Sequence, residues 1–132
     1  MSCKSALYAA NTNAQTLNID NTINFGSIVR RYGCNVHLSG GNAIVKGAGY
    51  YDIDTNFTFT AGDAGVAIIT LYKDGTAIPG AVQSESVTAG SIYNFNIPVI
   101  VRSCCDCEST ITAVLSGVAG TINNAAISVE RI

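Results

Sequence analysis

The chain has 132 residues, the length of one domain, and can bury a core without the help of a metal or a disulfide. Charged residues make up only 12% of it, whereas average soluble proteins carry roughly 25%. Because a small monomer needs charges over its surface to stay unassociated, we expect part of this surface to be covered by copies of the same chain.

Charge and hydropathy exclude two classes of partner. The net charge is −2 and the seven basic residues are scattered along the chain, so no basic face for nucleic acid can form. The uncharged run at 109–129, "STITAVLSGVAGTINNAAISV", is long enough to span a membrane, but Ser, Thr, Asn and Gly interrupt it throughout. We therefore expect neither a nucleic-acid nor a membrane partner.

The first half of the chain reads as short strands followed by one long strand. The short segments "ALYAA", "QTLNI", "GSIVRR", "CNVHL" and "AIVK" are separated by Gly, Asn and Ser. In the segment 51–60 the residues alternate strictly, so that Tyr51, Ile53, Thr55, Phe57 and Phe59 share one face. This pattern predicts a strand with one buried side.

A hairpin is the clearest local feature of the middle of the chain. The segment 65–72, "GVAIITLY", is apolar on both faces, as expected for a central strand covered from both sides. Asp74-Gly75 follows it, and this pair tolerates the positive φ angles of a type I′ turn. The chain is therefore expected to reverse there and pair with "TAIPGA".

The last third of the chain predicts three more strands. In the segment 91–102 the expected buried set is Tyr93, Phe95, Ile97, Val99 and Val101. A proline within this segment cannot donate to a ladder, which predicts an edge strand or a bulge near Pro98. "STITAVL" and "AISVERI" complete the series.

Helical periodicity never holds for as many as eleven residues, so we predict an all-β fold. Eight to ten short strands at this spacing favour an antiparallel jelly-roll β-sandwich over a parallel sheet with crossover helices.

Three segments carry a resemblance to a known superfamily. They are "GCNVHLSGGNAIVKGAGYYDIDTNFTFT", "VAIITLYKDGTAIPGA" and the closing "AAISVERI". In this order they resemble the trimeric jelly rolls of the C1q and tumour-necrosis-factor-like superfamily. More closely, the chain is similar to small cysteine-containing proteins of gut Firmicutes and their phages, where such domains serve as virion decoration or head-fibre pieces. The resemblance implies a homotrimer with an inner sheet around a threefold axis and the closing strand at that axis.

The resemblance also suggests a division of the chain. It covers roughly residues 28–132, so we expect the jelly-roll domain at 26–132. Residues 1–25 are either a polar arm that pairs with a neighbouring surface or the first strand or strands of the sandwich.

Five cysteines invite a metal or redox interpretation. Cys34, His37, Cys104 and Cys107 have spacings reminiscent of a four-ligand zinc site. Residues 34 and 37 of an extended strand, however, point to opposite faces and lie about 10 Å apart. Alternation in "GCNVHL" favours Cys34 as a core residue with His37 outside. Zinc, a disulfide or thiol pair within the loop of Cys104, Cys105 and Cys107, and reduced cysteines all remain open, and reduced cysteines are favoured.

No other residue set predicts a catalytic, cofactor or metal site. His37 is the only histidine, and it reads as a surface residue. Asp52 and Asp54 share a strand face roughly 7 Å apart but lack further oxygen ligands nearby in sequence. Of Arg30 and Arg31, one is expected to face solvent. Tyrosines are expected as core or trimer-interface anchors rather than as a glycan-stacking surface; they are Tyr32, Tyr50, Tyr51, Tyr72 and Tyr93.

We therefore expect a non-enzymatic structural protein with no cofactor. The leading hypothesis is a homotrimeric phage capsid decoration or head-fibre protein bound to the major capsid protein or another virion protein. The N-terminus has no signal-peptide pattern, so synthesis in the host cytoplasm and residence in the virion are expected. The alternative is a bacterial surface or spore-coat trimer that recognises glycans or proteins. A collagen-like or coiled-coil stalk would favour that alternative, and this sequence encodes none.

Overall fold

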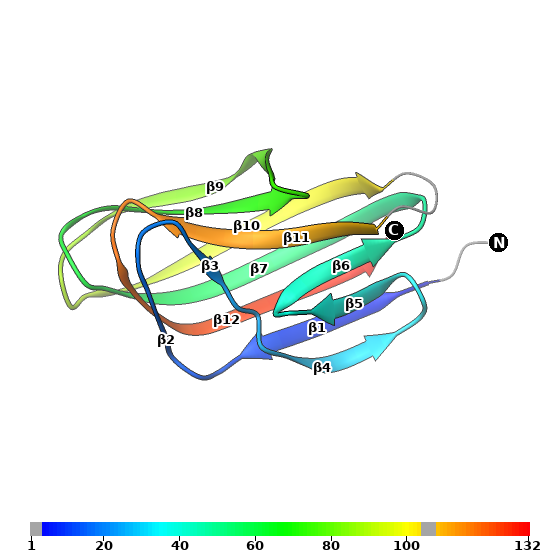
Figure 1. Cartoon of the computed structure of the whole chain (residues 1–132), viewed down its shortest axis with the longest axis horizontal. Helices are drawn as coiled ribbons and strands as arrows, with labels where there is room; N and C mark the ends of the chain where they lie inside the picture. Colours follow the sequence, from blue (N-terminus) through cyan, green and yellow to red (C-terminus); the bar gives the residue numbers. More distant parts are fainter. Residues whose placement is uncertain (1–3, 104–107) are drawn as a thin grey trace.

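The computed structural model describes residues 4–103 and 108–132, which form two antiparallel β-sheets packed face to face (Figure 1). These residues contain strands and turns but no helix. The all-β class and the antiparallel jelly-roll sandwich are thus confirmed.

Sheet A holds the long closing strand at its centre. Its strand order is β10-β7-β12-β1-β4, and the short β2 pairs with the N-terminal end of β12. Its strands are β1 (Ala6–Asn11), β2 (Gln15–Leu17), β4 (Ser27–Tyr32), β7 (Gly49–Ala61), β10 (Ile92–Ser103) and β12 (Gly120–Arg131).

Sheet B covers the inner face of sheet A. Its order is β5-β6-β11-β8-β9, and the short β3 pairs with β11. Its strands are β3 (Asn21–Ile23), β5 (Val36–Ser39), β6 (Asn42–Lys46), β8 (Gly65–Lys73), β9 (Thr76–Val87) and β11 (Glu108–Ser116).

The described residues contain twelve strands, more than the eight to ten expected. Part of the excess comes from residues 1–25, for which the sequence left open an arm or the first strands. In the structure this segment supplies β1, β2 and β3, and β1 lies between β12 and β4 in sheet A. The three-residue β3 was not predicted, because three residues are too few to show a period of two.

The core lies between the two sheets and follows the predicted alternation. On β7 the inward set Tyr51, Ile53, Thr55, Phe57 and Phe59 is buried. Phe59 packs edge-on against Phe95 of β10 with ring centroids 6.1 Å apart, a favourable aromatic geometry. On β10 Phe95, Ile97 and Val101 are buried, while Tyr93 and Val99 of the predicted set are half-buried.

The predicted hairpin is present. Lys73 pairs with Thr76, and the two turn residues Asp74 and Gly75 have φ angles of 52° and 82°. Both values are positive, as a type I′ turn requires.

The predicted edge position of Pro98 is also confirmed. Among the described strands, β10 pairs with β7 alone and forms one edge of sheet A. At this edge the missing N–H of proline leaves no ladder bond unmade.

Strand β8 differs from its prediction. It is central in sheet B, and Ala67, Ile69 and Leu71 are buried on its inner side. Its other side is not covered by the described chain, since Val66 is 50% exposed and Ile68 is half-buried. The apolar pattern on both faces therefore reflects a hydrophobic outer surface on sheet B.

Candidate interaction surface

The residues considered for a zinc site are only partly within the described chain. Cys34 is exposed in the bend between β4 and β5, and His37 is half-buried on β5. Cys104, Cys105 and Cys107 lie outside the described residues. Within residues 4–103 and 108–132, no three His, Cys, Asp or Glu side chains are placed to hold a metal ion.

The prediction that Cys34 belongs to the core is wrong. It extended the strand alternation back to residue 34, but β5 begins only at Val36. Gly33 has a φ of +87°, a left-handed conformation that turns the chain before the strand starts. Val36 is therefore the first residue of this segment to enter the core, and His37, expected outside, is half-buried.

The two aspartates on β7 point outward from sheet A, as the alternation predicted. Both Asp52 and Asp54 are exposed. The structure adds Glu130 of β12, which lies directly opposite Asp52 in the ladder. Sequence reasoning missed this third carboxylate because it comes from a strand nearly eighty residues away.

The adjacent arginines have different environments. Arg31 donates a hydrogen bond from Nε to the Val36 carbonyl oxygen at 2.6 Å and so links β4 to β5. Arg30 lies opposite Tyr8 in the ladder and is exposed. One of the pair thus has a structural bond, and the other is available at the edge of sheet A.

The tyrosines divide between the core and the surface. Tyr51 is fully buried, and Tyr72 and Tyr93 are half-buried. Tyr32 and Tyr50 are exposed on strands of sheet A, where Tyr8 joins them. Tyr8 was not on the predicted list, because the short segment "ALYAA" does not reveal which residues face outward.

Buried Tyr51 closes one end of the sandwich. Its hydroxyl lies 2.9 Å from the carbonyl oxygens of both Lys46 and Gly47 and can donate to either. Burial raises the pKa of the Tyr51 hydroxyl, and the nearby Arg131 opposes part of this rise. The hydroxyl is therefore a neutral donor at physiological pH and has a structural role.

Exposed hydrophobic residues concentrate on sheet A. Of the eleven large hydrophobic residues that are exposed in the described part of the chain, seven lie on strands of this sheet. They are Tyr8, Ile28, Val29, Tyr32, Tyr50, Ile92 and Ile100. Ile28 lies opposite the buried Ala9 and so points to the inner side at the β4 edge. Tyr8, Tyr50, Ile92 and Ile100 alternate with buried or half-buried residues and point outward from sheet A. Exposed apolar groups that share one outer face mark an interaction surface.

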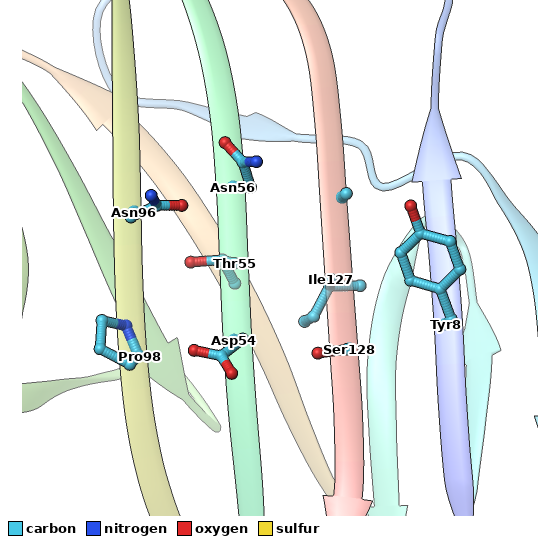
Figure 2. Close-up of a pocket in the computed structure, with 9 residues that line it drawn as sticks. Tyr8, Asp54, Thr55, Asn56, Asn96, Pro98, Ile127 and Ser128 are labelled. Carbon is cyan, nitrogen blue, oxygen red and sulfur yellow. The ribbon is translucent and has the colours of Figure 1, made fainter.

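A depression of about 480 Å³ lies in the middle of this outer face. Figure 2 shows Asp54 and Asn56 of β7, Asn96 and Pro98 of β10 and Tyr8 of β1 around it. The depression forms because β12 contributes the small side chains Ala126 and Ser128 between the larger ones of its neighbours.

The depression presents polar and apolar groups side by side. Its lining residues include the carboxylate of Asp54 and the phenol of Tyr8 but no His, Cys or Lys. The depression offers hydrogen-bond donors and acceptors beside apolar surface, as subunit contacts do.

Residues 4–103 and 108–132 contain no helix long and apolar enough to cross a bilayer.

Comparison with known proteins supports the fold at the structural level only. No protein-family model matches the sequence, and no curated protein matches it significantly. Among solved structures, murine APRIL at pH 5.0 superposes with a TM-score of 0.75 at 11% identity, covering 98% of this chain and 99% of the other.

Two further solved structures have similar folds. The PRD1 vertex protein P5 gives a TM-score of 0.65 at 11% identity over 97% of this chain and 96% of its own. The globular domain of zebrafish complement 1qA protein gives 0.64 at 5% identity over 95% and 94%. The chain therefore has the C1q and tumour-necrosis-factor-like jelly-roll fold over nearly its whole length.

Proposed function

We propose that this chain is a non-enzymatic structural protein of a phage particle, and that it assembles as a homotrimer through the outer face of sheet A. The observation that carries the proposal is the concentration of exposed Tyr and Ile side chains on that face, around a depression lined by uncharged groups and one carboxylate. In a monomer this surface would remain in water, whereas contact with sister copies removes it from water with a gain of free energy.

The trimeric state rests on the fold. The resemblance to the C1q and tumour-necrosis-factor-like superfamily implies a threefold axis beside the closing strand "AISVERI". In this structure that strand is β12, which occupies the centre of sheet A and lines the depression. The exposed face and the position expected for the axis therefore coincide.

The phage role rests on two further likenesses. The sequence resembles small virion proteins of phages that infect gut Firmicutes, and the fold resembles a protein described as a vertex protein of PRD1. The partner in the particle would be the major capsid protein or another virion protein.

Oligomeric state is the first test. We expect light scattering of the purified chain at micromolar concentration to give a mass near three times 13.7 kDa. A mass near 13.7 kDa would overturn the trimer and the interface together.

The location of the chain tests the phage role separately. Particles released from the host would be banded on a density gradient and probed with an antibody against the chain, and cryo-electron microscopy would locate it. We expect the chain to band with intact capsids as threefold density on their surface. Recovery from the cell envelope or the spore coat instead would overturn the phage role and favour the surface binding module.

A further inference from the structure

The outer face of sheet A carries opposite charges at the two ends of one cross-strand row. In the ladder Pro98 lies opposite Asp54, Asp54 opposite Ser128, Ser128 opposite Tyr8, and Tyr8 opposite Arg30. Residues directly opposite in antiparallel strands share a face. The row therefore runs from an acidic group near the β10 edge to a basic group on the β4 edge.

These two charges do not meet within one chain. Asp54 and Arg30 are three strands apart, about 14 Å at the usual strand spacing, with Tyr8 and Ser128 between them. Both side chains are exposed.

The acidic end gathers carboxylates on two neighbouring strands. Asp52 lies two residues along the same face of β7, and Glu130 lies directly opposite Asp52. Like charges opposite each other in a ladder destabilise the pair. A cation brought in from outside the chain would relieve this repulsion, and Asp54 presents its carboxylate in the open depression (Figure 2).

The basic end is an edge strand that is exposed along its whole length. All six residues of β4 are exposed, and the strand pairs with β1 on one side only. Tyr32 is 60% exposed and shares its row with Glu130 and Asp52 through Ala6. The β4 edge thus presents the Arg30 guanidinium and the Tyr32 phenol. Each lies in the same cross-strand row as carboxylates farther across the same outer face.

We propose that Arg30 of one copy binds Asp54 of the next copy, so that the β4 edge of each subunit covers the β7–β10 end of its neighbour's sheet. This proposal rests on the homotrimer proposed above and specifies its contact. Rotation about an axis parallel to the strands keeps each row level and brings one edge of a sheet to the opposite edge of its neighbour. Charge complementarity of this kind sets the register and the partner in an interface.

Charge reversal tests the pairing. Arg30→Glu and Asp54→Arg are made singly and together, and the trimer dissociation constant is measured by sedimentation over a dilution series. We expect each single reversal to raise the trimer dissociation constant by roughly tenfold or more. The double variant should recover most of the lost affinity. Asp63→Arg, the same reversal in the exposed turn between β7 and β8, is the matched control and should leave the trimer unchanged.

Each outcome has a distinct meaning. A wild-type chain that is not a trimer overturns the proposed function. A wild-type trimer that tolerates both single reversals, or that loses affinity without recovery in the double variant, overturns the Arg30–Asp54 pairing and leaves the trimer standing. Because a misfolded single variant would not be rescued by a second reversal, recovery also excludes a folding defect. Asp54→Asn, which removes the charge without reversing it, should give a smaller loss than Asp54→Arg.

Discussion

At the scale of single residues, the interior of the sandwich depends on a few polar groups placed at its ends. The Tyr51 ring is fully buried while its hydroxyl meets two backbone carbonyl oxygens, those of Lys46 and Gly47. Lys46 ends β6 and Gly47 follows it, and the Lys46 oxygen also accepts a hydrogen bond from Asn35 Nδ2 at 2.7 Å. One side chain thus fills the core and joins the hydrogen-bond network at the end of β6.

Removal of this hydroxyl should destabilise the fold. We expect Tyr51→Phe to lower the free energy of unfolding by about 1 kcal/mol, because the hydrogen bond from the hydroxyl is lost while Asn35 Nδ2 still donates to the Lys46 oxygen. Urea denaturation at one fixed protein concentration measures the change. Tyr72→Phe is the matched control: Tyr72 is half-buried on β8 of sheet B, outside the proposed trimer face, so its variant should stay within about 0.5 kcal/mol of wild type. Equal losses in the two variants would contradict this role for Tyr51.

The raised pKa of Tyr51 makes this contribution pH-dependent. Its ordinary value is 10.0, and burial raises the pKa in the folded state. Above pH 10 the unfolded chain therefore releases this proton first, so the contribution is complete below pH 10 and declines as the pH rises further. The stability difference between wild type and Tyr51→Phe should shrink over that range. Tyr93, whose pKa is lowered by its hydrogen bonding with Thr88, is present in both proteins and cancels.

Cys34 and Val36 give a second contrast, two residues apart. Because Cys34 is exposed in a bend, we expect Cys34→Ser to change the free energy of unfolding by less than about 0.5 kcal/mol. Val36 is fully buried, and Val36→Ala should cost about 2 kcal/mol through lost packing and the cavity left behind. Chemical denaturation of the two variants under reducing conditions checks both values. A large loss of unfolding free energy in Cys34→Ser would instead indicate that Cys34 is a core residue.

At the scale of elements, alternation predicted the long strands because one face of each is buried against the other sheet. In β7 every second residue enters the core, and the pattern is visible in the sequence alone. The bend at Gly33 was not visible, because glycine permits a turn without requiring one. The candidate surface could not be predicted from the sequence either, because Tyr8, Asp54 and Ser128 become neighbours only through the pairing and register of their strands. The sequence predicted each outward residue on β7 but not its cross-strand partners.

Substitutions at two turn glycines would distinguish the free-energy cost of a positive φ angle from that of a steric clash. Gly75 and Gly117 have similar φ angles of +82° and +88°. A Cβ at Gly75 would meet nothing, whereas one at Gly117 would collide with the Val66 carbonyl oxygen. We expect Gly75→Ala to cost about 1 kcal/mol and Gly117→Ala at least ~2 kcal/mol more. Thermal or urea unfolding measures both. Gly75→Asn should be tolerated better than Gly75→Ala, since asparagine adopts positive φ more readily.

At the scale of the whole molecule, the central question is which sheet faces its sister copies. Both outer faces carry apolar groups, since Val66 and Val82 are each 50% exposed on sheet B. Sheet A has the larger set, the depression and the central closing strand. An introduced charge distinguishes the two faces, because an unpaired charge is costly only where association removes it from water.

Ala126 of β12 and Thr112 of β11 are matched positions for this test, since each is half-buried and lies on the outer face of a central strand. We expect Ala126→Glu to convert the trimer to species of 13.7 kDa at micromolar concentration, because its carboxylate would be buried against a neighbour and close to Asp54. Thr112→Glu should keep the trimer, because water continues to solvate its carboxylate. Light scattering reports both masses, and circular dichroism checks that each variant retains its sheet content. The reverse result, with Thr112→Glu dissociated and Ala126→Glu intact, would move the interface to sheet B.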